Sequence, residues 1–526
     1  SITVSKADVH LGATNKTDYL YSLNDTAALL AAQDVDSVAA VGSAQAVTVS
    51  TTASIAQLAA ITTSKSSSAT LTYTSITDTS DNLVSDGGTY VTGSHAVIFS
   101  DAHTTSSLKT INGRTTGSIT LHDTSVALED DTSGILTAIG GTFTHSTYTG
   151  TISITDAAGV SLTATNLSTI GNFTNKDVTV GKAVTITGSA SELTDALVSG
   201  SKLVVAGTAL VTVTDTAFHA TTNTATIAAT VLSGIGNKTT GAVTVSNAIK
   251  VTGSSSELTD ALVSGSKIVS AGTALVTVTD AAYHATTNTA TIAATALSGI
   301  GAKTTGTVTL KNKVRISGNQ SDVTAALIGG SSVVASQTAT EAVVTNAVNA
   351  SQGAAIAGVS KITGIFSGGL TDSSGNLVSG ITTSANLNTV ASEDADVNIS
   401  INDAAFHATT NTATITAAGL SAIKAKTTGT LTVSAAAKIV GSQAQVTKAL
   451  VTDSITASTA LVTINDAAFH ATTNTATIAA TALSGIGNAT SGTVTVSNGI
   501  KVTGSASDLT DALVSGSKLV VAGTAL

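Results

Sequence analysis

The chain of 526 residues contains no proline, cysteine, methionine or tryptophan, and aromatic residues make up only 2% of it. Proline alone averages roughly 5% of proteins, so these absences are not sampling noise. Without cysteine, folding is indifferent to the redox state of the compartment, which suits a secreted protein. Without large rings, the 42% hydrophobic content comes mainly from Ala, Val, Ile and Leu. These small side chains predict a narrow core rather than a wide globular one.

Charged residues are also scarce, at 10% of the chain, with 22 basic and 32 acidic residues and a formal net charge of −10. No cluster of Lys and Arg interleaved with aromatic residues exists, which argues against nucleic-acid binding. No apolar run reaches the roughly 18–20 residues that a membrane span needs. Low charge combined with high apolar content also argues against disorder.

The sequence repeats itself with a period of about 65 residues, as the spacing of His219 and His284 shows. Within this period lies a half-period, because strand-like strings such as VTVTD recur every 31 to 33 residues. These strings begin at Val211, Val243, Val276, Val308, Leu431, Val462 and Val494. Such regular spacing without long loops is typical of a repeat protein in which each turn of the chain covers the apolar edge of the previous one.

Each half-repeat has the same order of elements. VTVT alternates apolar and hydroxyl residues, which predicts a strand with Val211 and Val213 pointing inward and Thr212 and Thr214 pointing outward. A second extended piece follows (ATI or IKVTG), then a short helical turn (AATALSGIG or SELTDALVSG) and a TTG or SAGT turn. Ser256 before Glu257 indicates a helix start. The predicted fold is mainly β: a parallel β-solenoid with about 32 residues per coil, built from two short strands and a short helical turn.

The regularity of the pattern divides the chain into four segments. Residues 1–150 are expected to form irregular N-terminal coils, 151–335 regular repeats, 336–396 divergent coils and 397–526 regular repeats. The sequence begins SITVSKADVH, with neither an initiator Met nor a signal peptide. It stops within SKLVVAGTAL, a string that at 201–210 continues into VTVTD. We therefore expect a longer parent chain.

The string DAAFHATTNTATI at 403–415 returns almost unchanged from residues 215, 280 and 466, so a histidine recurs four times in one setting: His219, His284, His407 and His470. A zinc site needs three or four converging ligands, and each unit offers one His and one nearby Asp. Ser and Thr are so frequent that a chance triad carries no weight. The favoured interpretation is packing, in which Phe218, Tyr283, Phe406 or Phe469 and the following His fill a wide corner. We therefore predict no catalytic, cofactor-binding or metal-binding residue, and no enzyme.

The residue that closes each strand alternates between Asp and Asn, in the order Asp215, Asn247, Asp280, Asn312 and later Asp466, Asn498. Because like charges on neighbouring strands repel, this alternation is expected of a stacking ladder that keeps carboxylates two coils apart. Calcium is compatible with these oxygens, but the chain has no calcium-binding motif. We therefore predict no cofactor.

The strings ATVLSGIGNKTTGAVTVS at 229–246 and ATALSGIGAKTTGTVTL at 294–310 resemble the very long Thr/Ala/Val-rich repeat proteins of cyanobacteria and other aquatic bacteria. The looser ASIAQLAAITTSKSSSATLTYTSITDT at 53–79 is similar to the same group. The resemblance covers most of the chain but is compositional and transfers no functional residue. It implies a secreted bacterial protein of a surface layer (S-layer), fibre or adhesin.

The sequence therefore predicts an extracellular structural protein at the cell surface that self-associates, with filaments formed head to tail from copies of itself. The alternative is an adhesin that binds cell-surface polysaccharide. Ice binding by the outward threonines is disfavoured, because Lys311 and serines at 246 and 497 interrupt the array. A polysaccharide-acting enzyme is the remaining alternative.

Overall fold

The computed structural model describes residues 1–11, 20–199, 204–221, 225–263, 269–287, 290–329, 333–335, 340–409, 413–473, 476–514 and 520–521. The chain forms two compact units, and each is described by itself. Unit 1 comprises Ser1–Ile249 and Asp260–Gly272, and unit 2 comprises Lys250–Thr259 and Thr273–Leu526. The predicted division into four segments remains a prediction.

The predicted mainly-β solenoid is wrong. Helices occupy 33% of the chain and strands 27%, and the strands form many short parallel sheets, so the fold is α/β. The predicted helical turn is in most steps a complete helix of eight to ten residues, such as α8 (Ala164–Phe173) and α9 (Ala190–Leu197). The sequence analysis underestimated these segments because they are rich in Ala, Ser, Thr and Gly and short on strong helix formers.

The elements of unit 1 alternate between short strands and short helices. The remaining helices are α1 (Val4–Leu11), α2 (Ala27–Leu30), α3 (Val35–Ser43), α4 (Ile55–Ser64), α5 (Ser80–Ser85), α6 (Thr105–Asn112), α7 (Thr132–Ile139) and α10 (Ala229–Gly236), while α11 (Ser255–Leu262) has residues in both units. The parallel sheets have the strand orders β1 (Ser22–Asp25)-β2 (Ala46–Val49)-β3 (Thr70–Thr72); β4 (Ser75–Asp78)-β5 (Ala96–Phe99)-β6 (Ser118–Thr120)-β8 (Thr142–Phe143); β7 (Leu128–Asp130)-β9 (Ile152–Ile154)-β11 (Val178–Val180)-β13 (Val204–Val205); and β10 (Ser161–Thr163)-β12 (Thr185–Gly188)-β14 (Leu210–Val213)-β16 (Val243–Val245)-β18 (Val269–Ser270). Strand β15 (Thr226–Ala228) precedes α10.

Unit 2 has the same construction. Its helices are α12 (Ala294–Gly301), α13 (Gln320–Leu327), α14 (Ala350–Ala357), α15 (Ser374–Leu377), α16 (Ala385–Glu393), α17 (Ala417–Lys424), α18 (Gln443–Thr447), the π-helical η1 (Lys448–Thr452), α19 (Ala480–Asn488) and α20 (Ala506–Leu513). The strand orders are β17 (Lys250–Gly253)-β19 (Leu275–Val278)-β21 (Val308–Leu310)-β23 (Val333–Ala335); β20 (Thr291–Ala293)-β22 (Arg315–Gly318)-β24 (Thr340–Val344)-β25 (Ile362–Ile365); β26 (Leu370–Asp372)-β29 (Ile399–Ile401)-β31 (Leu431–Val433); β30 (Thr414–Thr416)-β32 (Lys438–Gly441)-β33 (Leu461–Ile464)-β35 (Val494–Val496)-β37 (Val520–Val521); β34 (Thr477–Ala479)-β36 (Lys501–Thr503); and the antiparallel pair β27 (Val378–Ser379)-β28 (Thr382–Thr383).

The strand register shows how the 65-residue period is built. Ile186, Val211 and Val243 occupy one register position, so the chain advances 25 residues and then 32. The 32-residue step contains the histidine loop, and the step from Val243 leads to Val269 rather than to Val276. A single ladder through Val211, Val243 and Val276 at uniform intervals is therefore not formed. The sequence analysis averaged long and short steps into one coil length.

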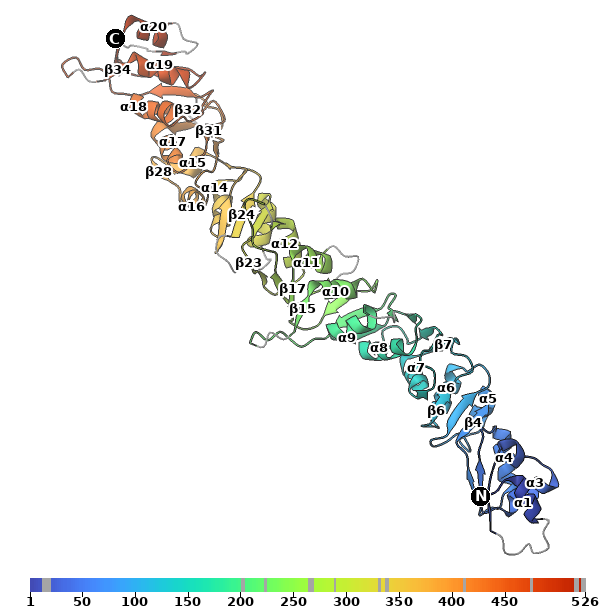
Figure 1. Ribbon diagram of the computed structural model, residues 1–526. Helices are drawn as coiled ribbons and strands as arrows, with labels where there is room; N and C mark the ends of the chain where they lie inside the picture. The colour runs from blue at the N-terminus through green and yellow to red at the C-terminus, as the bar shows by residue number, and fades with distance from the viewer. Residues whose placement is uncertain are drawn as a thin grey trace. The chain divides into compact units, whose positions relative to one another are not determined.

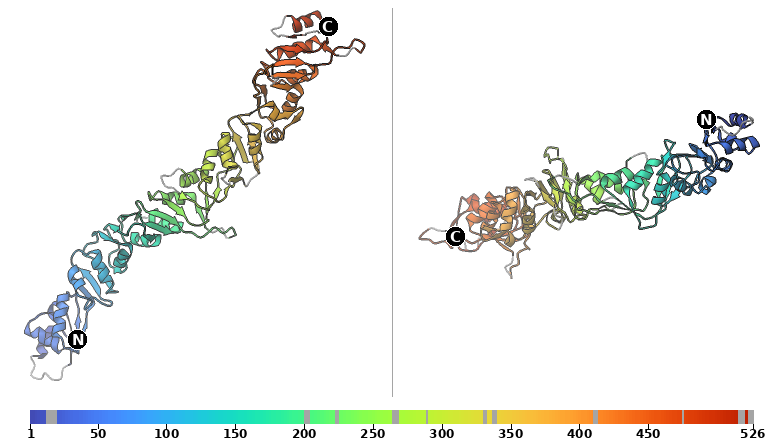
Figure 2. Two further views of the ribbon diagram at one scale, coloured as in Figure 1. Left: turned by 180° about the vertical axis from the view of Figure 1, so that it is seen from behind. Right: turned by 90° about the horizontal axis from the view of Figure 1, so that it is seen from below.

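The core of each unit lies between the inner strand faces and the helices. Val211 and Val213 are buried and Thr212 and Thr214 are not, which confirms the predicted alternation. The helices add pairs of apolar residues three apart, such as Leu167 with Ile170 and Leu232 with Ile235. In unit 1, α6 to α10 pack on one another in chain order, as Figures 1 and 2 show. Among the described residues, every helix is too short or too polar to cross a membrane.

Side-chain caps define where the helices begin. In α11 the cap is Ser254, whose hydroxyl accepts a hydrogen bond from the Glu257 N–H (3.2 Å) while the Glu257 carboxylate accepts one from the Ser254 N–H (2.8 Å). This capping box fixes the helix start two residues before the predicted Ser256. Ser189 and Glu192 form the same box at α9.

An aspartate that follows a strand caps the helix of the preceding step. Asp215, after β14, accepts at Oδ2 a 2.7 Å hydrogen bond from the N–H of Ala190, the first residue of α9. This contact satisfies an N–H that has no partner within the helix and places negative charge at the positive end of the helix dipole. The same contact recurs between Ile55 and Asp78, Ser80 and Asp101, Thr132 and Asp156, Ser255 and Asp280, Ala350 and Asp372, Ser374 and Asp403, and Gln443 and Asp466.

The alternating asparagines bond to the backbone of these aspartates. Asn247 donates from Nδ2 to the Asp215 carbonyl oxygen at 2.6 Å. Asn312 with Asp280 and Asn498 with Asp466 repeat this contact at 2.6 Å. The structure thus gives the Asp–Asn alternation a direct role between successive strands, while the carboxylate oxygens considered for calcium accept hydrogen bonds from helix N-termini.

The first threonine of each TTG turn joins two successive steps. Thr239 is buried, and its hydroxyl donates to the carbonyl oxygen of Ala209 and accepts from the Gly241 N–H at 2.9 Å. A Cβ atom on Gly241 would lie 2.2 Å from the same carbonyl oxygen, so only glycine fits. We call this contact the threonine joint. It recurs with Thr304 and Gly306, Thr427 and Gly429, and Thr490 and Gly492.

The aspartate cap predicts a measurable stability difference. Asp215→Ala leaves the Ala190 N–H without its acceptor and should lower the free energy of unfolding by about 1–2 kcal/mol. Asp215→Asn should lose less, because Asn346 Oδ1 makes the same contact with the Gln320 N–H at 2.6 Å. Equilibrium denaturation followed by far-ultraviolet circular dichroism measures both. An unfolding midpoint unchanged in Asp215→Ala would contradict the assignment.

The threonine joint predicts a contrast between adjacent threonines. Thr239→Val keeps the shape but removes the hydroxyl that binds two backbone groups, and should destabilise the protein by about 1–3 kcal/mol. Thr240→Val changes an exposed side chain and should stay within about 0.5 kcal/mol. The same denaturation experiment compares the two variants. Equal losses would show that the buried hydroxyl has no special role.

Candidate functional site

The four histidine loops lie at the surface. His219, His284, His407 and His470 are exposed, while the aromatic residue before each is half-buried. The predicted aromatic–histidine packing pair is therefore wrong for the histidines, which leave the corner to the ring alone. No group of three or more His, Cys, Asp or Glu that could hold a metal ion occurs in the described ranges.

The backbone fixes each aromatic residue against the following step. The N–H of Tyr283 donates to the Lys313 carbonyl oxygen at 2.6 Å, and that of Phe469 to Gly499 at 2.6 Å. Each loop ends in an alanine with positive φ, namely Ala225, Ala290, Ala413 and Ala476, at 56–59°. This left-handed conformation is unusual for a residue with a Cβ, and it recurs because the loop must turn sharply into the next strand.

A basic side chain covers the aromatic ring in three of the loops. The Arg315 Cζ lies 4.1 Å from the centre of the Tyr283 ring, Lys438 Nζ lies 4.9 Å from that of Phe406, and Lys501 Nζ lies 5.6 Å from that of Phe469. These are cation–π geometries. The sequence analysis missed the basic partners, although each follows its ring by 32 residues and starts the next but one strand. That constant spacing was the available signal.

A groove of about 450 Å³ lies beside the Phe406 ring and crosses β32, β33 and β35, near the β32 label in Figure 1. We call it the Phe406 groove. Its walls combine the ring with an ammonium group and a row of outward hydroxyls, and its lining is Phe406, Lys438, Leu461, Val462, Thr463, Thr493, Thr495 and Ser497. An aromatic ring beside hydroxyls and one charge is the composition of a small-molecule binding surface.

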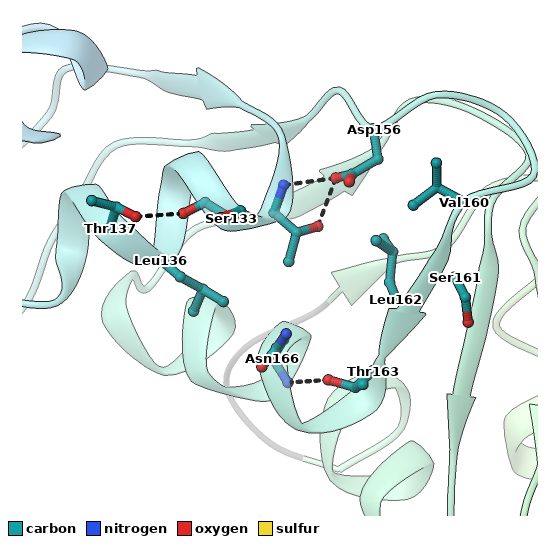
Figure 3. A pocket seen from close by; sticks show the side chains of 10 residues that line it. Ser133, Leu136, Thr137, Asp156, Val160, Ser161, Leu162, Thr163 and Asn166 are labelled. Atoms are coloured by element: carbon teal, nitrogen blue, oxygen red, sulfur yellow. Dashed lines mark hydrogen bonds between the residues drawn. The ribbon is translucent and has the colours of Figure 1, made fainter.

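A second kind of recess lies between consecutive steps of unit 1, and Figure 3 shows the larger example, with a volume of about 500 Å³. It is formed by the first turns of α7 and α8, by Asp156 and by β10. The Asp156 carboxylate accepts from both the N–H and the hydroxyl of Thr132, at 2.7 and 2.6 Å, and the Asn166 N–H is capped by Thr163. A recess of about 380 Å³ with Asp215 in the place of Asp156 repeats this arrangement. The polar groups at both recesses serve as helix caps, so their role is structural.

Unit 1 also contains a buried cluster of aromatic and histidine side chains: Phe99, His103, Phe143, His145, Tyr148 and Phe173. His103 is 2% exposed, and its Nε2 lies 2.8 Å from the Tyr148 hydroxyl, which itself donates to the Val126 carbonyl oxygen. Because the hydroxyl proton is used there, Nε2 must carry the imidazole proton and donate. His103 Nδ1 is buried without a hydrogen-bond partner.

This environment disfavours the charged imidazole. Burial lowers the pKa of His103 from 6.5 to about 4 and lowers the pKa of His145 as well, whereas burial raises the pKa of Tyr148. Protonation of His103 would add an N–H at Nδ1 where no acceptor lies, which agrees with the direction of the shift. The cluster is therefore neutral at pH 7, and its chemistry is packing rather than proton transfer.

The His103 cluster predicts loss of stability in acid. A histidine whose pKa is depressed in the folded state stabilises the fold fully above its ordinary pKa, and this contribution falls as the pH drops from about 6.5 towards 4. His103→Gln retains an N–H donor for Tyr148 without titrating, and should lose less thermal stability than the unsubstituted protein between pH 7 and pH 4.5. Circular dichroism melting curves at both pH values measure this. Identical pH dependence of the two proteins would contradict the assignment.

The Phe406 groove is thus the surface feature whose composition best suits a ligand, and the histidine loops contribute its ring rather than their histidines. The repeated construction of both units offers no fold-level assignment of activity. Comparison with protein-family models gives no match, and comparison with curated proteins finds none similar to the chain.

Proposed function

We propose that the protein is an extracellular structural repeat protein that forms or decorates a cell-surface fibre or layer and associates with copies of itself. The observation that carries this proposal is the reuse of one set of backbone joints. The threonine joint and the aspartate cap recur in both units with the same partners and nearly the same distances. A chain built this way gains length by copying a step, as repeat scaffolds do.

Self-association is supported by apolar side chains that recur on the outside. Val205 in unit 1 and Val334 in unit 2 are 44% and 50% exposed, and each is the second residue of a Val–Val pair after a helix. Leu210, which begins β14, is 46% exposed. Exposed apolar residues at one position of a repeat favour contacts between copies, although single ones are common on any protein surface.

Binding of cell-surface polysaccharide is the second candidate function. The Phe406 groove favours it, because its aromatic ring and hydroxyl rows match the apolar faces and hydroxyl groups of sugars. Adhesion of this kind and self-association use different surfaces, so one protein can do both. Secretion and a cell-surface location are common to the two candidates.

Self-association has a direct test. Sedimentation velocity over a concentration series should show a sedimentation coefficient that rises with concentration, and electron microscopy should show filaments or a lattice. Val205→Asp combined with Leu210→Asp should move the onset to at least about tenfold higher concentration, since each charge opposes burial in an interface. Thr212→Asp adds a charge to the same sheet and serves as the control.

Two outcomes would contradict the proposal. One is a monomer at every concentration up to the millimolar range with no assembled particles in the microscope. The other is the absence of label when antibodies raised against the chain are applied to intact source cells, because a surface structure must be accessible to them.

A further inference from the structure

We propose that the Phe406 groove is a binding site for an acidic polysaccharide, with Lys438 pairing to a sugar carboxylate, the Phe406 ring packing on a sugar face, and Thr463 and Thr495 bonding to sugar hydroxyls. This inference deepens the second candidate function and is independent of self-association. It assigns the ligand class from the charge of the groove.

The Lys438 ammonium supplies the charge. Lys438 is half-buried at the start of β32, with Nζ 4.9 Å from the centre of the Phe406 ring. In the part of the chain that the structure describes, no carboxylate lies within ion-pair distance of Lys438. A partly desolvated cation without a counter-ion attracts an anion more strongly than a fully solvated lysine does.

The chain contains its own comparison for this site. Arg315 starts β22 and lies over Tyr283 as Lys438 lies over Phe406. The residue paired with Arg315 on the next strand is Glu341, whose carboxylate accepts from Nη2 at 2.6 Å and from Nε at 2.7 Å. At Lys438 the residue in that register position is Leu461. The cation of the first site thus has an internal counter-ion, while that of the second site faces an apolar side chain.

The hydroxyls beside the cation are placed for a chain-like ligand. Thr463 and Thr495 are register partners on β33 and β35, so they lie side by side at about the 4.8 Å strand spacing. Ser497, at the far end, donates to the Ile464 carbonyl oxygen at 2.9 Å and thus keeps an acceptor position only. Together these groups extend the groove across two strands away from the ring, as a ligand of several linked sugars requires.

An acidic ligand is favoured over a neutral one for a further reason. The net charge of −10 opposes non-specific adsorption of polyanions, so any binding of one must come from a local positive site. The groove provides a cation and no acidic side chain in its lining. The attraction is short-range and should weaken as salt increases.

The test uses isothermal titration calorimetry of the full chain with galacturonic acid oligosaccharides and, separately, neutral malto-oligosaccharides of equal length. Leu461→Glu places the counter-ion of the Arg315 site next to Lys438, and Lys438→Gln removes the charge. Both variants should weaken galacturonate binding about tenfold or more, as expected for loss of a charged hydrogen bond. Lys426→Gln removes one exposed charge from the same unit and should bind as the unsubstituted chain does.

The outcomes separate the two proposals. Circular dichroism verifies folding of each variant, and sedimentation of Leu461→Glu should match that of the unsubstituted chain, because self-association uses other residues. The inference is overturned if the unsubstituted chain binds neither sugar, if it binds both equally, or if Leu461→Glu and Lys438→Gln keep full affinity. None of these results bears on whether the protein forms filaments.

Discussion

The threonine joint is the contact on which the spacing of the steps depends. A buried hydroxyl bonds a carbonyl oxygen of the previous step and a glycine N–H of its own, so it fixes two backbones at one distance. The glycine is required because a Cβ would collide with that carbonyl oxygen. With this distance set, the strands fall into parallel register, and each strand-following aspartate reaches the helix before it. The aspartate cap is thus a consequence of the joint, and the short helices depend on both.

The unusual composition follows from this construction. Every step uses threonine for the joint, glycine for close approach, aspartate or asparagine for the cap, and small aliphatic residues for a core that strands and helices share. Proline lacks the N–H that parallel ladders and helix caps use, and its absence suits a chain in which nearly every segment belongs to one or the other. Large rings gather in the His103 cluster and the histidine loops, where the step is irregular.

The sequence predicted the inward Val211 and Val213, the turns and the order of elements, because alternation and repetition leave direct traces in the letters. It failed on the fold class, since AATALSGIG reads as a weak helix former, and its helix is stabilised by caps from residues about 25 positions away. It averaged steps of 25 and 32 residues into one coil, because the repeat is visible only as their combination. The Phe406 groove was missed for the same reason. Its ring, cation and hydroxyls are separated by up to about ninety residues and meet only through the register.

A repeat scaffold acquires a site by losing regularity at one position rather than by building a new element. The Arg315 and Lys438 sites share the loop, the ring and the cation, and differ in the one residue that faces the cation across the ladder, Glu341 or Leu461. An exposed ion pair contributes little to stability, so exchanging glutamate for leucine there leaves the fold intact while exposing a charge to a ligand. Because the joints and caps lie on other residues, such exchanges are independent of the scaffold. The two sites are therefore best understood as the closed and open forms of one surface, and the ligand chemistry of the chain depends on which register partner each cation has.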